Sequence, residues 1–525
     1  MSETGQKTGQ EQARSGLLAS SLVVGSMTLL SRVLGLVRDV VLARTFGVSA
    51  GTDAFFVAFR IPNFLRRLFA EGAFNQAFVP VLSEYREKGS REAAQLLVNR
   101  VAGSLGSTLV WISVLGVIGA PLLITIFAPG FGDDPYKRGL AVEMLRLTFP
   151  YLFFISLTAF AGSILNTWGR FAVPAFTPVL LNLSLIGAAL FLAPQFADER
   201  VAVALAWGVL IAGVLQLAFQ LPFLARIGLL PRPEIGFADP GVKKIMALMA
   251  PALFGVSVSQ INLLLDTVLA SLLQTGSVTW LYYSDRLVEL PLGVFAIAIG
   301  TVILPSLSRD HASDSTQQFS ATLDWAMRLV LLIGVPSMLA LMVISEPLLA
   351  ALFLYGDFTR FDVEMASLSL RAYALGILAF MFIKILAPGF FARQDTKTPV
   401  KIGIIAMVAN MVLNLMLVWH FKHMGLALAT ALSAWLNAGL LYYGLRERGV
   451  YQPGPGWTMM LIRFAIAGAV MAAVVYWLAG QTPVWFEGRA LARAGWLAIL
   501  VPTGAISYVM VLLLLGMRMR HLRRQ

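Results

Sequence analysis

Apolar segments long enough to cross a lipid bilayer recur along the chain from Leu17 to Gly516, with short polar breaks between them. A transmembrane helix needs about 20 apolar residues, and fourteen such segments can be counted. They are continuous apolar runs, whereas the strands of a membrane barrel are about ten residues long and alternate in hydrophobicity. Because a helix satisfies its own backbone hydrogen bonds in hydrocarbon, the pattern predicts an all-α polytopic membrane protein with 14 transmembrane helices.

Composition agrees with this interpretation. Of the 525 residues, 58% are hydrophobic and only 13% are charged, so lipid must be part of the solvent of the folded chain. The first apolar segment carries Arg32, Arg38 and Asp39 and has no evident A-x-A cleavage site, so we expect it to remain in the mature protein. The polar residues 1–16 before it are expected to form a disordered cytoplasmic leader.

Positive charges are distributed unequally between the polar breaks. With the N-terminus placed in the cytoplasm, the cytoplasmic breaks hold 20 Lys and Arg residues and the opposite breaks hold 8. This asymmetry obeys the positive-inside rule. Since the number of spans is even, the basic tail that includes Arg518 and Arg520 returns to the cytoplasm. The sequence therefore predicts that both termini are cytoplasmic.

The chain contains an internal repeat. Three pairs of similar segments are PVLSEY from Pro80 and PSLSRD from Pro305, PLLITIFAPGF from Pro121 and PLLAALFLYGDF from Pro347, and RFAVPAF around Pro174 and DTKTPVK around Pro399. Their offsets are 225, 226 and 225 residues, which predicts two six-helix lobes related by a pseudo-two-fold axis along the membrane normal. The predicted parts are an N-lobe over residues 17–228, a C-lobe over 229–450, and two further helices with a basic cytoplasmic tail over 451–525.

Arginines inside apolar spans are the strongest functional signal. Charged residues at the centre of a membrane helix cost about 2.5 to 3.5 kcal/mol each, so they need a cavity or a partner. Five in-span arginines lie between residues 32 and 67, among them Arg32, Arg38 and Arg66. Arg286 lies in the part of the second lobe that corresponds to this region in the repeat. Because the guanidinium binds phosphate or carboxylate bidentately, this pattern predicts an anion site between the lobes.

Acidic residues are interleaved with these arginines. Asp39 follows Arg32 by seven positions, and Asp53, Arg60 and Arg67 repeat that spacing, which places each set on one helix face. In the second lobe, Asp285 and Glu289 lie beside Arg286. Ion pairs that open and close are one interpretation. Static structural pairs and side chains that reach the membrane surface are the alternative.

A second polar group lies in the predicted C-lobe. Asp266 interrupts the apolar run INLLLDTVLASLL, Asn410 and Asn414 share a helix face, and Thr430 follows in the next span. Oxygen ligands of this kind suit a monovalent cation such as sodium. Interhelical hydrogen bonding is the competing interpretation.

Several other functions are disfavoured. The chain has no cysteine, and its four histidines form no evident cluster, which argues against a structural or catalytic metal site. The net charge of +12 is spread over helix ends instead of a basic domain, so nucleic acid is not an expected partner. No P-loop motif precedes a helix and all loops are short, which disfavours a nucleotide-driven pump and a membrane-embedded glycosyltransferase.

Five segments of the chain together resemble one family. They are SRVLGLVRDVVLARTFG, TDAFFVAFRIPNFLRRLFAEGAFNQAFVPVLSEY, LNTWGRFAVPAFTPVLLN, WLYYSDRLVELPLGV and FFARQDTKTPVK. The chain resembles the MurJ (MviN) family of bacterial lipid II flippases, within the multidrug/oligosaccharidyl-lipid/polysaccharide exporter superfamily, from about Leu17 to the end. The resemblance implies a V-shaped central cavity, alternating access and a location in the bacterial inner membrane. It implies a transporter rather than an enzyme, with lipid II and membrane lipids as partners and cell-wall synthesis proteins as further ones.

The resemblance also implies roles for particular residues. Arginines that are essential in the family correspond to Arg32, Arg38, Arg66 and Arg286 of this sequence. Acidic positions that the family uses for function or gating correspond to Asp53, Glu71 and Glu289. The last two helices would form a groove for the polyprenyl tail. Asn414 replaces a carboxylate found in sodium-binding relatives, so that site is in doubt here and no other cofactor is expected. An exporter of another polyprenyl-pyrophosphate-linked glycan and a multidrug or cation antiporter remain the alternatives.

Overall fold

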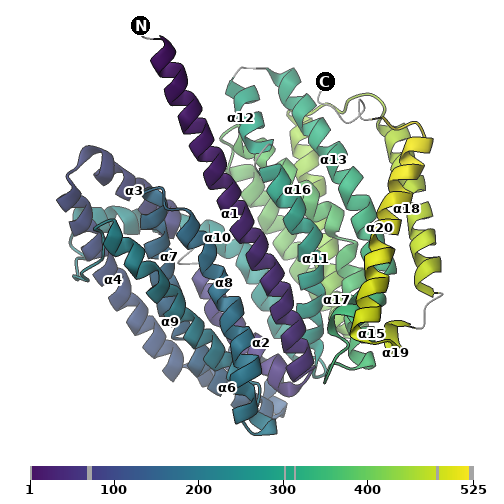
Figure 1. Cartoon of the computed structure of the whole chain (residues 1–525), viewed down its shortest axis with the longest axis horizontal. Helices are drawn as coiled ribbons and strands as arrows, with labels where there is room; N and C mark the ends of the chain where they lie inside the picture. The colour runs from purple at the N-terminus through teal and green to yellow at the C-terminus, as the bar shows by residue number, and fades with distance from the viewer. Residues whose placement is uncertain (1–2, 68–73, 301–302, 313–314, 481–483, 519–525) are drawn as a thin grey trace. The chain divides into compact units, whose positions relative to one another are not determined.

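The computed structural model describes residues 3–67, 74–300, 303–312, 315–480 and 484–518. Over these residues the chain is built from helices, without a strand (Figure 1). The predicted all-α class is therefore confirmed for this part of the chain. Two compact units, here called unit 1 and unit 2, comprise Met1–Leu264 and Leu265–Gln525. They divide within helix α10 (Pro240–Ser271), whereas the predicted lobe boundary at residues 228 and 229 falls in the linker before this helix.

The principal helices of unit 1, besides the first part of α10, are α1 (Glu3–Phe46), α2 (Ala50–Arg66), α3 (Phe74–Lys88), α4 (Arg91–Ile118), α5 (Ala120–Phe127), α6 (Pro135–Thr148), α7 (Tyr151–Thr167), α8 (Ala172–Gly187) and α9 (Val203–Arg226). Those of unit 2, besides the rest of α10, are α11 (Ser277–Gly300), α12 (Ile303–Ala312), α13 (Thr316–Val343), α14 (Ser345–Phe353), α15 (Arg360–Ala374), α16 (Ile377–Phe391), α17 (Lys397–Glu447), α18 (Trp457–Gly480), α19 (Val484–Glu487) and α20 (Ala490–Leu514). Helix α1 begins at Glu3, so it includes most of the leader that the sequence predicts to be disordered. That segment contains Gln, Glu, Lys, Arg and Ala, which are good helix formers.

Membrane-spanning segments are evident from length and composition. Within the described residues, nine helices or continuous helix pairs are long and apolar enough to cross a bilayer. The 51-residue helix α17 exceeds any single crossing, since a helix rises about 1.5 Å per residue and the hydrocarbon is about 30 Å thick. It breaks at Lys422, where φ is 51° and ψ is −134°. At this corner a Cβ atom on Gly425 would lie 2.5 Å from the carbonyl oxygen of Leu417, so the close approach requires glycine.

Helix boundaries recur at the offset found in the sequence. Five consecutive helices of unit 1, α4 to α8, begin at residues 91, 120, 135, 151 and 172. Five consecutive helices of unit 2, α13 to α17, begin at residues 316, 345, 360, 377 and 397. Each pair is 225 or 226 positions apart. The repeat in sequence therefore corresponds to a repeat of secondary structure.

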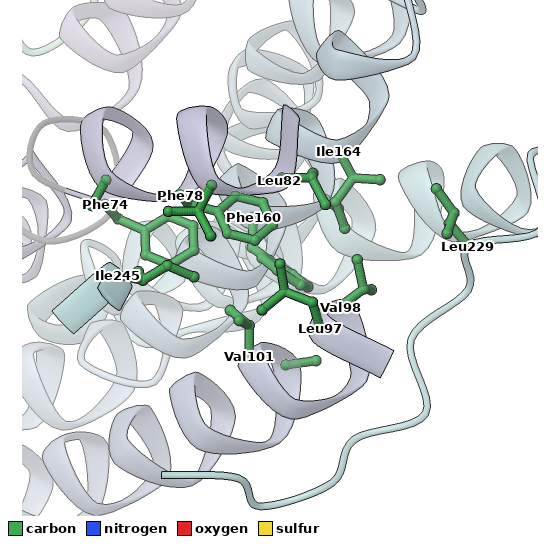
Figure 2. Packing of buried hydrophobic residues seen from close by; sticks show 14 of the residues in the cluster. Phe74, Phe78, Leu82, Leu97, Val98, Val101, Phe160, Ile164, Leu229 and Ile245 are labelled. Carbon is green, nitrogen blue, oxygen red and sulfur yellow. The ribbon is translucent and has the colours of Figure 1, made fainter. Parts of the chain in front are cut away.

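Aromatic packing holds the helices of unit 1 together. Figure 2 shows Phe74 and Phe78 of α3 beside Phe160 of α7, with Leu97 of α4 and Ile245 of α10 in the same cluster. The rings of Phe74 and Phe78 are stacked with centroids 5.0 Å apart, and those of Phe78 and Phe160 are 5.1 Å apart. Each buried phenylalanine contributes about 1.5 to 3 kcal/mol. Since Ile245 lies in this cluster, the start of α10 packs with unit 1.

The C-terminal helices are anchored to unit 2 through a buried carboxylate. Asp324 of α13 accepts hydrogen bonds from Tyr451 Oη at 2.8 Å, Gly454 N at 3.0 Å and Trp457 Nε1 at 2.7 Å, and Arg328 Nε donates to its other oxygen at 2.7 Å. Helix α18 also packs against α13 and α20 (Figure 1). The linker before the last two long helices is therefore fixed to the body of unit 2.

Candidate functional site

Arg38 is the most firmly held of the predicted arginines in unit 1. It is buried on α1, and its Nε and Nη2 donate to Asp39 Oδ1 at 2.9 and 2.6 Å. Its Nη1 donates to Asn182 Oδ1 on α8 at 3.0 Å, while Asn182 Nδ2 donates to the carbonyl of Ser31. Helix α1 packs along α8, and this network fixes the guanidinium at their contact. Asp39 thus forms an ion pair with Arg38, its neighbour in the sequence.

The other two arginines of unit 1 have different surroundings. Arg32 lies on the same helix as Arg38 and is exposed. Arg66 ends α2, donates from Nε to Asn63 Oδ1 at 2.8 Å, and lines a cavity of about 280 Å³ together with residues of α3, α7, α8 and α9. Glu71 lies outside the described residues, so no contact can be given for this predicted gating residue. The structure therefore brings Arg38 together with Asp39, and places Arg66 at a separate polar cavity.

A lysine on another helix of unit 1 pairs with Asp53. Lys137 Nζ of α6 lies 2.8 Å from Asp53 Oδ2 of α2, and both side chains are at most 5% exposed. Lys137 also lies over the ring of Phe131, 4.4 Å from its centroid. Helix α6 begins at Pro135 after the N-cap Asp134, which turns Lys137 into the protein. Lys137 is the third residue of this helix, and the Asp-Pro helix start predicts where the helix begins but not that Lys137 reaches Asp53.

In unit 2, Arg286 lies on α11 beside the acidic residue predicted for it. Arg286 Nη1 donates to Glu289 Oε2 at 2.7 Å, and both side chains are partly exposed. The guanidinium also lies 5.7 Å from the ring centroid of Tyr282. Asp285, the third member of this group, is half-buried on the same helix. Arg286 is therefore held in place while part of it remains accessible.

The predicted cation ligands form a hydrogen-bonded chain within unit 2. Asn414 Nδ2 donates to Asp266 Oδ1 at 2.7 Å and to Asn410 Oδ1 at 3.0 Å. Asn410 Nδ2 in turn donates to Ser433 Oγ at 3.3 Å and lies 3.5 Å from Thr430 Oγ1. An amide N–H thus occupies the position beside the Asp266 carboxylate where a cation would bind. These residues are thus joined by hydrogen bonds, and their role as a cation site stays a prediction.

A polar turn in the motif FFARQDTKTPVK lies between the membrane-spanning helices α16 and α17. The Thr398 hydroxyl donates to Asp395 Oδ2 at 2.6 Å, and the Thr398 backbone N–H donates to Oδ1 at 3.0 Å. With these bonds and the Arg448 guanidinium, the pKa of Asp395 is lowered to about 2. Asp395 is therefore ionised at neutral pH and ties the turn to the end of α17.

Sequence reasoning missed several polar residues that contact site elements. Asn182 accepts a hydrogen bond from Arg38, and Asp324 accepts hydrogen bonds from the linker before α18. Gln216 and Gln220 line the cavity beside Arg66. The signal for the last two was available, since two glutamines four positions apart share a face of an otherwise apolar helix. Arg38 lies 144 positions from Asn182 and Trp457 lies 133 positions from Asp324, and local periodicity carries no information on contacts at such separations.

Comparison with known proteins gives one consistent result. A profile for the family described as "Lipid II flippase MurJ" matches residues 42–494. A probable lipid II flippase MurJ of Vibrio cholerae is 51% identical over 514 residues, covering 97% of this chain and 98% of the relative. A lipid II flippase MurJ of Burkholderia cenocepacia is 43% identical over 516 residues, covering 97% and 99%.

Solved structures give the same assignment. A structure of the lipid II flippase MurJ in an inward closed conformation matches with a TM-score of 0.79 and 28% identity, over 93% of this chain and 98% of the other. An inward-facing multidrug transporter of the MATE family matches with a TM-score of 0.66 at 15% identity, covering 82% and 98%, which shows a shared fold only. Because the profile spans most of the chain and the sequence relatives cover nearly all of it, the chain belongs to the MurJ family of lipid II flippases.

Proposed function

We propose that this chain is a lipid II flippase that moves the undecaprenyl-pyrophosphate-linked peptidoglycan precursor from the cytoplasmic to the periplasmic leaflet. The observation that carries the proposal is its 51% identity to a probable lipid II flippase over 97% of the chain. The chain acts as a multi-pass transporter of the bacterial inner membrane and not as an enzyme. Both termini lie in the cytoplasm, in agreement with the distribution of Lys and Arg.

The proposed architecture has fourteen spans in two six-helix lobes and two further helices. Support comes from the recurring helix boundaries at an offset of 225 or 226 residues and from the break of α17 at Lys422, which divides this helix into two crossings. The lobes are related by a pseudo-two-fold axis along the membrane normal and alternate access to a site between them. Helices α18 and α20 form the groove for the polyprenyl tail.

Arginine side chains bind the pyrophosphate in this proposal. Arg38 and Arg286 each have a carboxylate partner, Asp39 at 2.6 Å and Glu289 at 2.7 Å. These acids hold the guanidinium groups in position until the doubly charged pyrophosphate competes for them, and bidentate contacts to phosphate are well suited to arginine. Arg32, which is exposed on α1, and Arg66 complete the cationic set. Asp39, Asp53, Glu71, Asp285 and Glu289 act as gating or positioning acids.

The membrane potential supplies the energy in this scheme. An inside-negative potential is worth about 2.3 kcal/mol per charge per 100 mV, and it favours outward movement of an anion. The empty cationic carrier is drawn to the inward-open state, and neutralisation of its arginines by pyrophosphate permits the outward-open state. A sodium requirement is not part of the proposal, because the Asn414 amide donates to Asp266.

The test uses cells depleted of their own flippase and supplied with the wild-type chain or with Arg286→Ala. Externally accessible lipid II is the readout. Wild type is expected to restore it and Arg286→Ala to fail at equal membrane level. Arg360→Ala is the matched control, since Arg360 forms an exposed ion pair with Glu364 on α15, and it should behave as wild type.

Other outcomes separate the alternatives. If folded wild type restores no accessible lipid II, the substrate is another polyprenyl-pyrophosphate-linked glycan or a cationic drug, and the proposal is wrong. If wild type and Arg286→Ala both restore it, lipid II is the substrate but the arginine contact is not required. Collapse of the potential with no change in flux would contradict the proposed energy source.

A further inference from the structure

Unit 1 contains a polar cavity whose walls offer hydrogen-bond acceptors. It has a volume of about 280 Å³ and is lined by residues of α7, α8 and α9 together with Arg66 and Asn75. Gln216 and Gln220 of α9 are 2% and 1% exposed, and their side-chain carbonyl oxygens have no hydrogen-bond partner among the described residues. Buried carbonyl oxygens without a donor are uncommon in folded proteins, so the cavity calls for a ligand that supplies donors.

The orientation of both amide groups follows from their other contacts. Gln216 Nε2 donates to the backbone carbonyl of Thr177 at 3.1 Å, and a carbonyl can only accept. Gln220 Nε2 donates to Thr177 Oγ1 at 2.8 Å, while that hydroxyl donates its own proton to the carbonyl of Val173. The nitrogen atoms are thus in use on α8. In both glutamines the side-chain oxygen is the atom without a hydrogen-bond partner among the described residues.

Two prolines of α8 also line the cavity. Pro174 and Pro178 both line the cavity and lie four positions apart within α8. Proline has no backbone N–H, so Pro178 cannot donate to the carbonyl of Pro174 as another residue in a helix would. Ser163 and Thr158 contribute hydroxyl groups from α7. Polar atoms of α7 therefore lie in the same lining as the glutamines of α9.

The charge of the lining selects the class of ligand. Arg66 lines the cavity, and no acidic residue is among the described residues that do so. A cation would be repelled by the guanidinium, whereas an anion alone would leave the two glutamine oxygens without donors. The lining suits a neutral group rich in hydroxyl and N–H donors that adjoins a negative charge. The volume of about 280 Å³ lies just below the roughly 300–1,000 Å³ typical of ligand sites, and it is enough for one sugar ring.

We infer that this cavity is a subsite for a single sugar residue of the lipid-linked head group, with Arg66 beside the adjoining phosphate. The inference rests on the proposed function and assigns Gln216 and Gln220 as residues that distinguish a glycosylated lipid from its bare pyrophosphate. The glutamine oxygens accept from hydroxyl or acetamido N–H groups of the sugar. Their role is recognition of the head group.

The test measures equilibrium binding of two lipids to the purified full-length chain in nanodiscs. The probes are lipid II and undecaprenyl pyrophosphate, which lacks the sugars and the peptide. Wild type is expected to bind lipid II about tenfold more tightly, because two neutral hydrogen bonds together give about that factor. Gln216→Leu and Gln220→Leu should each weaken lipid II binding several-fold and leave undecaprenyl pyrophosphate binding unchanged. Gln195→Leu, at an exposed glutamine of unit 1, should change neither.

A second variant keeps both glutamines and their bonds to Thr177. A Cβ on Gly162 of α7 would lie 3.6 Å from Gln220 Oε1 and 3.3 Å from Pro174 Cβ. Gly162→Ser therefore places a hydroxyl beside Gln220 Oε1 and narrows the cavity, and serine suits a helix better than glycine does. We expect it to fold, to bind undecaprenyl pyrophosphate as wild type does, and to lose about the same lipid II affinity as Gln220→Leu.

The possible results distinguish the subsite from the proposed function. Wild type that binds neither lipid overturns the proposed function and the subsite with it. Wild type that binds both lipids equally, or variants that retain the full preference for lipid II, overturn the subsite alone. A parallel loss of both lipids in Gly162→Ser also overturns it, because the cavity would then serve the structure of unit 1 rather than sugar recognition.

Discussion

Lys137 Nζ lies 2.8 Å from Asp53 Oδ2, and this ion pair joins helices α6 and α2 inside unit 1. The two residues are 84 positions apart, and their side chains are 5% and 1% exposed. In unit 2, Trp280 Nε1 of α11 donates to Asp362 Oδ1 of α15 at 2.9 Å. Asp362 is the residue 225 positions after Lys137. Corresponding helix pairs in the two units are thus joined by buried polar contacts with different chemistry.

The Asp53–Lys137 pair predicts a strong effect of removing one partner. Lys137→Met leaves the Asp53 carboxylate buried without its cation, and a loss of this kind costs about 3 to 5 kcal/mol. We expect a clear fall in the melting temperature measured by tryptophan fluorescence in detergent. The double variant Asp53→Leu/Lys137→Met should recover most of the loss, since an apolar pair needs no compensation.

The control for this prediction is the ion pair between Arg200 and Glu143. These side chains are 55% and 37% exposed, and an exposed pair is worth about 0 to 1 kcal/mol. Arg200→Ala should therefore leave the melting temperature nearly unchanged. A Lys137→Met protein as stable as Arg200→Ala would show that the buried pair does not stabilise unit 1.

Much of the fold follows from the sequence because it is carried by local patterns. Apolar length predicts the spans, and the offsets of Pro174 and Pro399 anticipate the recurring helix boundaries. The helix class and the family were predictable for the same reason. The roles of the predicted arginines and acids in substrate binding and gating stay predictions.

Contacts between distant helices could not be predicted in this way. The seven-residue spacing of Arg32 and Asp39 places them on one helix face, but Asp39 pairs with its neighbour Arg38. The face of α1 that meets α8 buries Arg38 and Asp39 together, and Asn182 of α8 is a further acceptor for Arg38. Spacing along one helix specifies which residues share a face, whereas the neighbouring helix decides which of them is buried.

The Asn410–Asn414 chain predicts that the protein does not need sodium. Asn414 donates to Asp266 at 2.7 Å, so the carboxylate already has a hydrogen-bond partner. Thermal stability should be equal in sodium chloride and choline chloride. Asn414→Asp replaces the donor by a second carboxylate, and two adjacent carboxylates favour a bound cation. For this variant we expect sodium to raise stability by about 1 kcal/mol at several times its dissociation constant.

Asn414→Ala provides the control, because it removes the donor without adding charge and should show no difference between the two salts. Sodium stabilisation of the wild type, absent in choline, would contradict the prediction. It would show that Asp266 and its neighbours bind the ion despite the amide.

The hydrogen bonds to Asp324 are expected to hold the linker before helices α18 and α20 on unit 2. Three donors from the segment Tyr451–Trp457 converge on one oxygen of this carboxylate. Asp324→Ala leaves these donors unpaired, so the segment before α18 should open and become sensitive to trypsin after Arg446 and Arg448. We expect a loss of about 3 to 5 kcal/mol, as for a broken buried ion pair. The measurements are digestion rate and melting temperature.

Graded variants separate this role from a general loss of stability. Asp324→Asn keeps an acceptor for Tyr451 and Trp457 but loses the charge that pairs with Arg328, so its effect should be intermediate. Ser320→Ala removes only the exposed contacts with Gln452, and it should cost about 1 kcal/mol. Equal digestion of all three variants would mean that Asp324 does not anchor the linker.

The turn at Asp395 predicts a defined dependence on pH. The hydrogen bond from the Thr398 hydroxyl is the main reason that the pKa of this carboxyl is lowered from 3.8 to about 2. A carboxylate whose pKa is lower in the folded state stabilises that state above its unfolded pKa, and the contribution is lost as the pH falls toward the folded value. Asp395→Asn should therefore lower stability at pH 6 by about 1 kcal/mol, after allowance for the screening of an exposed group.

The difference between wild type and Asp395→Asn should be constant from pH 7 to 5, narrow below pH 4, and fall to about half near pH 3. Melting temperatures of both proteins across this range provide the measurement. Asp357→Asn, at an exposed position before α15, is the control for a general effect of removing a carboxylate. A difference that grows on acidification would have the wrong sign, because protonation of Asp395 must weaken the bonds from Thr398 and Arg448 in the wild type alone.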